Sequence, residues 1–431
     1  MHRPSEIPAP HGMDYKRNIF LIVFFLILQI FAVNIQAMTW KECVAAALEK
    51  NPSIAAAREN VFQKKTDVAS AVAPVLPRSS VSVNGGQGAT NGNESKDASF
   101  SMGTKQLLFD GLKSYYDIKS SKNRADAALY QYMVSESEVR LSLRNAFVRL
   151  MSAQESISIY RKIAQRRKEN YDLVKLRYEA GREHRGALLS SGASLAKANA
   201  DLSEALREIS LARRRLAALM GQNAFEGLTA EGDMFVVDEC RNRPDFDDIS
   251  RNSPLLMQMI ELKNAAASGA LASKLSFFPS VYGYFNAGRS KSSDGVAGKN
   301  WETGIEMSYP LTDGGERFHS ARKADSEVRV AEADLRQTRL DVLYTLEDKW
   351  SGLQGALDQK DVAEQFLDAT RERSRIAEAQ YSIGQITFNN WTIIEDDLVN
   401  AMKSQLTSRV GAMNAEAEWI QARGGMLSHE K

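Results

Sequence analysis

The chain has 431 residues, of which 25% are charged and 43% are hydrophobic, and its 55 basic side chains nearly balance its 54 acidic ones. These values are ordinary for a folded protein. A net charge of +1 gives no electrostatic basis for binding nucleic acid.

The N-terminus has the pattern of an export signal. Basic residues precede the apolar run 19–30, and Ala37 is a small residue suited to a cleavage site. We therefore predict a signal peptide over residues 1–37, with Met13 as an alternative start and 1–12 as an upstream extension. A retained membrane anchor is the alternative, but the apolar run is shorter than the ~20 residues that a spanning helix needs.

Residues that carry catalytic or metal chemistry are few. Cys43 and Cys240 either form a disulfide in an exported protein or remain as two buried thiols. The histidines are scattered and show no metal-ligand spacing. The stretch 295–300 lacks the spacing and the following Ser or Thr of a phosphate-binding loop. No nucleophile, histidine and acid form a catalytic pattern, so we predict neither an enzyme nor a cofactor.

One long unit occurs twice in the chain. Pro52 recurs 202 residues later as Pro254, and Gly181 recurs 203 residues later as Gly384. This period is much longer than that of a solenoid, and it predicts a pseudo-symmetric protein built from two copies. The predicted organisation is a signal peptide (1–37), a first repeat (38–221), a linker (222–243), a second repeat (244–424) and a C-terminal tail (425–431).

Each copy contains a very long helical pattern, from Gly111 to Tyr178 and from Gly314 to Tyr381. Such a helix would be roughly 100 Å long and needs a partner along its length. A second helical pattern follows each of the glycine turns, and apolar residues spaced by three and four predict antiparallel coiled-coil hairpins. In the first copy this stripe includes Val139, Leu143, Ala146, Leu150 and Ala153 before the turn, and Leu195, Ala198, Leu202, Ala205 and Ile209 after it.

A pair of strands is predicted before each long helix, joined by the polar loops 84–97 and 286–300. Four strands of about ten residues suit an outer-membrane crossing. Strict alternation over 301–309 predicts one lipid-facing side with aromatic residues at its ends; a water-exposed sheet on a soluble domain is the alternative. The predicted lipid-facing residues are Phe100, Met102, Trp301, Ile305, Met307 and Tyr309.

Four strands cannot close a barrel by themselves. Open edges in lipid leave backbone groups unsatisfied at several kcal/mol each, and single-chain barrels begin at about eight strands. The barrel must therefore be shared among protomers. Three copies would give twelve strands and a coaxial tube of helices, so the predicted fold class is mainly α with a small transmembrane β part.

The chain resembles TolC-like outer-membrane efflux proteins over about residues 39–424. The motifs are weak singly, but they are specific in this order and in two copies. They are Trp40–Leu48 followed by Asn51-Pro52; Ala71–Pro77; Leu108–Gly111; Tyr309–Gly315; and the helix ends Arg177–Gly181 and Gln380–Gly384.

The resemblance implies a homotrimer with a 12-stranded outer-membrane barrel and an α-helical tunnel in the periplasm. It also implies tips that dock a periplasmic adaptor bound to an inner-membrane pump of the RND or ABC type. Family tips have a small hydroxyl residue three positions after the glycine and often an Asp six positions after it, which Thr387 matches better than His184. The implied docking residues are Tyr178, Gly181, Arg182, His184, Tyr381, Gly384, Gln385, Thr387 and Asn389.

Some family members close the pore with an acidic ring just after the second tip. The aligned positions are Asn390 and Ile393, so that ring is not carried over. Glu395 and Asp396 lie slightly beyond, and the candidate gate is Asn390, Glu395 and Asp396. A solvated helix face is the alternative explanation for these acidic residues.

The predicted function is an outer-membrane duct of a tripartite export system that carries drugs, metals or a secreted polypeptide. A structural or adhesive coiled-coil surface protein is one alternative, but a stalk has no use for two strand pairs. A periplasmic adaptor is the other, but an adaptor has one coiled-coil hairpin and this chain has two.

Overall fold

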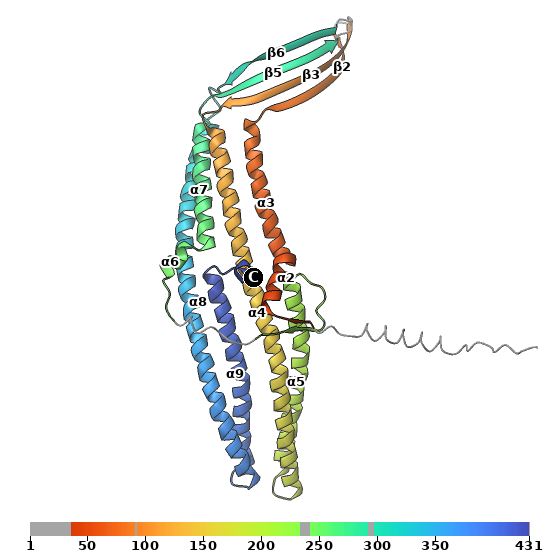
Figure 1. Cartoon of the computed structure of the whole chain (residues 1–431), viewed down its shortest axis with the longest axis vertical. Helices are drawn as coiled ribbons and strands as arrows, with labels where there is room; N and C mark the ends of the chain where they lie inside the picture. The colour runs from red at the N-terminus through yellow and green to blue at the C-terminus, as the bar shows by residue number, and fades with distance from the viewer. Residues whose placement is uncertain (1–35, 91–92, 233–241, 292–296, 431) are drawn as a thin grey trace, which may run out of the picture.

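The computed structural model describes residues 36–90, 93–232, 242–291 and 297–430. The molecule is elongated, with a four-stranded sheet at one end and two helical hairpin tips at the other (Figure 1). Within the described residues, no helix has both the length and the apolar character needed to cross a membrane.

The two repeats contain the same main elements in the same order. The first has α2 (Trp40–Lys50), α3 (Pro52–Val72), η1 (Ala73–Val75), β2 (Arg78–Thr90), β3 (Asn93–Phe109), α4 (Lys113–Glu179) and α5 (Arg185–Leu219). The second has α6 (Phe246–Arg251), α7 (Pro254–Leu275), β5 (Ser280–Lys291), β6 (Ala297–Ser308), α8 (Glu316–Ser382) and α9 (Phe388–Ala422).

The predicted long helices are confirmed: α4 and α8 have 67 residues each. Each begins after an Asp-Gly pair in which the glycine has a positive φ, +70° at Gly111 and +67° at Gly314. An L side chain is disfavoured there, because its Cβ approaches the backbone. The same local sequence therefore turns the chain from strand to helix in both copies.

The predicted coiled-coil hairpins are also present. In the half of the molecule near the tips, α4 packs on α5 and α8 packs on α9. Leu143 and Leu150 on α4 are fully buried, as are Leu346 and Leu353 at the equivalent positions of α8. In the half near the sheet, α3 packs on α4, while α7 packs on both α4 and α8.

A compact core lies between these two halves. Here β1 (Gln36–Met38) pairs in parallel with β4 (Leu228–Ala230), so the predicted signal-peptide boundary after Ala37 cuts through a strand. The predicted tail is partly embedded, because η3 (Leu427–Glu430) places the fully buried Leu427 in this core. Cys43 is a buried free thiol, whereas Cys240 lies outside the described residues.

The sheet is antiparallel with strand order β2-β3-β5-β6. Its strands have 13, 17, 12 and 12 residues, so the prediction of ten-residue strands with loops over 84–97 and 286–300 was wrong. The polar Gly, Asn and Ser residues assigned to the loops continue the hairpin ladders, as in the pair Gly86–Asp97. Their side chains favour turns, which is why the sequence pattern predicts a loop, but backbone pairing needs no apolar side chain.

Candidate functional site: the sheet faces and the hairpin tips

The sheet has one apolar and one polar face. Residues paired directly across antiparallel strands share a face, and one such row consists of Val81, Met102, Ala287 and Trp301. The adjacent row on the other face includes Ser82 and Ser101, whose hydroxyls are 2.7 Å apart. The register therefore separates the two chemistries over these rows, whereas nearer the hairpin ends Arg289 and Lys299 share the row of Phe100.

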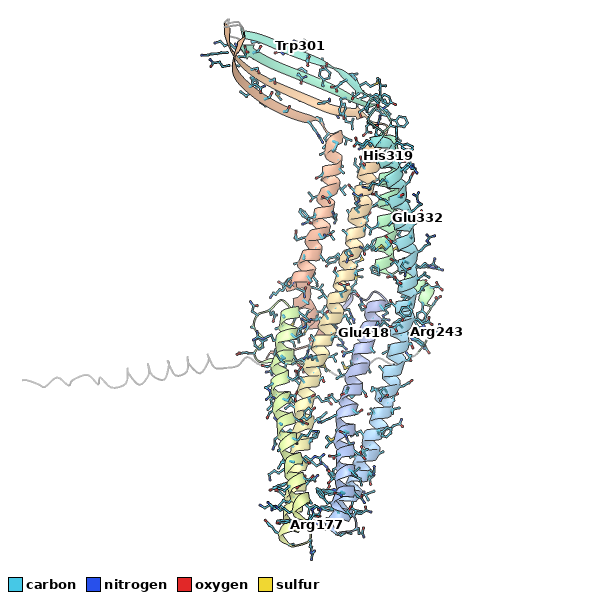
Figure 2. The ribbon with its side chains drawn as sticks, turned by 180° about the vertical axis from the view of Figure 1, so that it is seen from behind. Arg177, Arg243, Trp301, His319, Glu332 and Glu418 are labelled. Atoms are coloured by element: carbon cyan, nitrogen blue, oxygen red, sulfur yellow. The ribbon has the colours of Figure 1, made fainter. Side chains whose placement is uncertain are left out.

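The predicted lipid-facing residues are exposed on the isolated protomer. Trp301 has 72% of its surface exposed, Ile305 has 74% and Met307 has 68% (Figure 2 labels Trp301 on the sheet). Phe100 and Met102 on β3, with Tyr309 just after β6, are each about half exposed. An apolar face of this kind is typical of a surface that is covered by lipid or by another protein.

The polar face carries paired charges. The ammonium of Lys105 donates to both carboxylate oxygens of Glu306 at 3.0 and 3.1 Å and lies 4.3 Å from the centre of the Tyr282 ring. Asn286 donates to Glu302 at 2.8 Å. These pairs span strands β3, β5 and β6 and make this face suited to water.

Both edges of the sheet are open. Within the described residues, β2 pairs only with β3 and β6 pairs only with β5. Unpaired backbone groups at these edges would be costly in lipid.

Both hairpin tips are built around a left-handed glycine, Gly181 with φ +68° and Gly384 with φ +82°. The amide of the next residue reaches back five positions in each tip, from Arg182 to the Arg177 carbonyl and from Gln385 to the Gln380 carbonyl, both at 2.8 Å. This is the hydrogen-bond pattern of a glycine-terminated helix.

Each following helix has a side-chain N-cap. Thr387 accepts through its hydroxyl from the amide of Asn390 at 3.4 Å. His184 takes the same place in the first tip, where its Nδ1 accepts from the amide of Ala187 at 3.1 Å. Histidine thus replaces the expected hydroxyl residue in the same structural role.

The two tip tyrosines differ in their surroundings. Tyr178 is 38% exposed, whereas Tyr381 is fully buried and stacks on Trp391 with ring centres 4.3 Å apart. The Tyr381 hydroxyl donates to Glu183 at 2.8 Å, and burial raises its pKa. Arg177 lies over the Tyr381 ring and donates to its carbonyl at 2.8 Å (Figure 2 labels Arg177 at the tips). The Tyr381 ring is thus buried where the two tips meet, so within the predicted docking tip it lies beneath the surface.

The remaining predicted docking residues lie on the surface. Gly181, Arg182 and His184 are exposed on the first tip. Gly384, Gln385, Thr387 and Asn389 are exposed on the second tip.

The candidate gate residues do not form one group. Asn390 is exposed, and Asp396 is an exposed partner of Arg167. Glu395, in contrast, is 1% exposed. Neither a gate formed by these three residues nor a solvated acidic face describes this arrangement, because Glu395 points into the protomer.

Glu395 is the centre of a charge cluster that joins the two hairpins, and the partners of its carboxylate were not predicted. Arg166 on α4 donates to it at 2.7 and 2.9 Å and Asn170 at 3.1 Å, while Ser374 on α8 donates at a short distance. Burial opposes ionisation, but the hydrogen bonds from Arg166 and Ser374 hold the pKa of Glu395 below its ordinary value. The signal in the sequence is the adjacent Arg167, a basic residue that falls on the three-and-four spacing of the apolar stripe of α4.

The fold and the site define a class: an elongated chain of two repeats, each of which contributes a pair of antiparallel strands and a long coiled-coil hairpin. The family model described as "Outer membrane efflux protein" matches residues 43–222 and 247–425, one segment in each repeat. The chain belongs to this family. It is an outer-membrane efflux channel with a periplasmic helical part, and it is not an enzyme. The stalk and adaptor alternatives are thereby set aside.

Individual relatives are distant. Nodulation protein T of Rhizobium leguminosarum bv. viciae is 22% identical over 80% of this chain and 73% of its own length. The alkaline protease secretion protein AprF of Pseudomonas aeruginosa is 24% identical over 67% of this chain and 64% of its own length. The open-state MtrE outer-membrane channel of Neisseria gonorrhoeae superimposes with a TM-score of 0.79 at 18% identity, covering 90% of this chain and 89% of that one.

No groups of three or more His, Cys, Asp or Glu side chains that could hold a metal ion occur within the described part of the chain.

Proposed function

We propose that three copies of the chain assemble into a closed duct that conducts export cargo from a periplasmic adaptor, held by an inner-membrane pump, to the cell exterior. The observation that carries the proposal is the sheet, which is mainly apolar on one face, polar on the other and, among the described residues, unpaired at both edges. Three such sheets supply twelve strands, with the apolar face toward outer-membrane lipid and the polar face toward water.

The first test is the mass of the purified protein in detergent. Native mass spectrometry and light scattering should give a homotrimer, and planar bilayers containing it should show ion conductance. A monodisperse monomer that needs no detergent would contradict the proposal.

The orientation can be tested on whole cells. The hairpin ends of both strand pairs should face the exterior, because the opposite ends of the strands lead into the periplasmic helices. A cysteine at Ser292, which lies outside the described residues, should react with a membrane-impermeant maleimide. Labelling only after the outer membrane is permeabilised would show that the hairpin ends face the periplasm and that the proposed topology is wrong.

The tips are the proposed adaptor-docking surface. Gly384→Val should abolish export and leave trimers intact, because a Cβ at Gly384 meets only the end of Arg177, at 3.9 Å, and strains the turn rather than the core. Gly411→Val on α9 also enters open space and serves as the control. Normal export by Gly384→Val, or failure only through loss of trimers, would refute docking at this tip.

The class of cargo can be identified by comparing cells with and without the gene. The name of AprF, an alkaline protease secretion protein, supports a secreted polypeptide as cargo, and small-molecule efflux is the alternative. Deleting the gene and measuring both dye accumulation and the secreted protein profile separates these two cargo classes.

A further inference from the structure

The two hairpin tips have equivalent backbone turns, but their N-caps differ in one chemical property. The hydroxyl of Thr387, the cap of α9, accepts its hydrogen bond whatever the pH. His184, the cap of α5, accepts through its Nδ1 from the amide of Ala187 at 3.1 Å. A ring nitrogen accepts only while it carries no proton, so this cap exists only in the neutral histidine with its proton on Nε2.

We propose that His184 makes the first tip sensitive to acid. Histidine is the side chain that changes charge between about pH 5 and 8, and protonation of this one removes the cap of α5 and loosens the first tip. Adaptor docking then weakens as the pH falls, while the second tip keeps its cap at Thr387. The inference rests on the proposed docking role of the tips and adds a pH dependence to it.

A glycine two positions further on gives the imidazole its place. A Cβ on Gly186 would lie 3.0 Å from Nδ1 and 3.2 Å from Cε1 of His184, so a larger residue there would press on the ring. In the second tip, where the capping side chain of Thr387 is smaller, the equivalent residue is Asn389. The first turn of α5 is therefore shaped for an imidazole cap.

A carboxylate lies beside the other ring nitrogen. Nε2 of His184 is 3.8 Å from Oε1 of Glu183, whose side chain is only 10% exposed. Protonation thus exchanges the hydrogen bond from the Ala187 amide for an ion pair with Glu183. The added charge also lies at the N-terminus of α5, where the helix dipole disfavours a cation. Both effects favour an imidazole that has left the capping position.

Groups from three elements determine the charge around His184. They are Arg182, Glu183 and Arg185 in the turn and at the start of α5, Tyr381 on α8 and Arg177 on α4. The two flanking arginines disfavour a further positive charge, whereas Glu183 favours it. The Tyr381 hydroxyl donates to the second oxygen of Glu183 at 2.8 Å. A protonated His184 therefore competes for a carboxylate that already joins the two tips.

The cap also holds a buried contact between the tips. Ala187, the residue whose amide is capped, has no exposed surface and packs in the same core as Tyr381 of α8 and Trp391 of α9. Loosening of the first turn of α5 therefore disturbs the core on which both tips are built, and its effect extends beyond His184 itself.

Hydrogen exchange of the purified full-length protein in detergent tests the cap. The first turn of α5 is compared with the equivalent first turn of α9, at about pH 7.5 and about pH 5.5, after correction for the intrinsic pH dependence of exchange. In acid the α5 turn should exchange about fivefold faster relative to the α9 turn, the factor for loss of a typical N-cap. His184→Thr should abolish this change. His319→Thr, at the sheet end of α8 (Figure 2), is the control and should retain it.

Export by cells tests the consequence for docking, with the dye or secreted protein that deletion of the gene affects as the readout. Export by the unaltered protein, divided by export by His184→Thr at the same pH, should fall by up to about fivefold between about pH 7.5 and about pH 5.5.

The possible failures are distinguishable. Equal exchange of the two turns in acid would overturn the inference and leave the proposed duct standing. An acid-sensitive α5 turn with a constant export ratio would overturn its link to docking. If deletion of the gene changes neither readout, the proposed function fails, and the docking part of the inference fails with it.

Discussion

Helices α4 and α8 are equivalent elements of the two repeats, yet their surroundings in the protomer differ. Both have 67 residues, but α4 buries 20 of them and α8 buries only 9. The reason is position: α4 is flanked by helices on both sides, whereas α8 lies at an edge of the protomer.

The difference is clearest in the apolar residues that α8 leaves uncovered. Leu340 is 63% exposed, Tyr344 is 73% exposed and Phe366 is 65% exposed. At the position equivalent to Leu340, α4 has Ser137, which is 4% exposed. The repeat therefore sets the length and the coiled-coil face of each helix, and its place in the protomer sets the chemistry of the opposite face.

The shared coiled-coil face gives the largest expected effects. Leu143 and Leu346 are equivalent and fully buried, so Leu143→Ala and Leu346→Ala should each lower the free energy of unfolding by about 2–5 kcal/mol. Denaturant unfolding in detergent measures both. A difference well above 1 kcal/mol between them would show that the two faces are not equivalent.

The Glu395 cluster depends on an arginine that α4 supplies and α8 lacks, since the residue of α8 equivalent to Arg166 is Ala369. Glu395→Ala should destabilise the protein by about 3 kcal/mol, the low end for a broken buried ion pair, because the Arg166 side chain is 30% exposed. Asp358→Ala, which removes an exposed carboxylate on α8, is the control and should cost under about 0.5 kcal/mol. Equal shifts in unfolding temperature for the two variants would show that the cluster does not stabilise the contact between the hairpins.

The faces of α4 and α8 that lie opposite the coiled-coil contact differ in burial. Exchanging their residues should therefore affect protomer stability on α4 and trimer assembly on α8. Ser137→Leu should destabilise by about 1–3 kcal/mol, because it adds volume at a buried site. Leu340→Ser should change protomer stability by less than about 0.5 kcal/mol and should lower the fraction of trimer measured on dilution. A large loss of protomer stability in Leu340→Ser would mean that α8 is already covered within one copy.

The smallest expected effect on stability appears only at acidic pH. The pKa of Glu395 is lowered in the folded protein, so its contribution to stability is complete above its unfolded pKa of ~4.3 and is lost as the pH falls through the lower folded value. Glu395→Gln should flatten this part of the stability profile below about pH 4.5. The control is Asp358→Asn, at an exposed acid on α8. If the loss of stability at low pH is the same in Glu395→Gln as in the unaltered protein, other carboxylates determine that loss.

Much of the fold could be predicted because its signals are local. The long helices and the alternating strand at Trp301 follow from spacing within a short stretch of sequence, and the two repeats follow from short motifs that recur 202 and 203 residues apart. The strand ends, the burial of Tyr381 and the pairing of Glu395 with Arg166 could not be predicted. The strand ends depend on backbone pairing between polar residues that also favour turns, as in Gly86 with Asp97. The contacts of Tyr381 with Glu183 and of Glu395 with Arg166 join residues about 200 positions apart, and an exposed acidic helix face has the same sequence pattern as a buried, paired carboxylate.

The stack of Tyr381 on Trp391 gives the tips an optical signal of their own. Two aromatic rings 4.3 Å apart and nearly parallel, in a buried setting, should couple their near-ultraviolet transitions and produce circular dichroism that vanishes when the rings separate. Variants at the nearby turn can then be sorted without any label. One that retains the signal but loses export has an altered surface, whereas one that loses the signal has a disrupted tip.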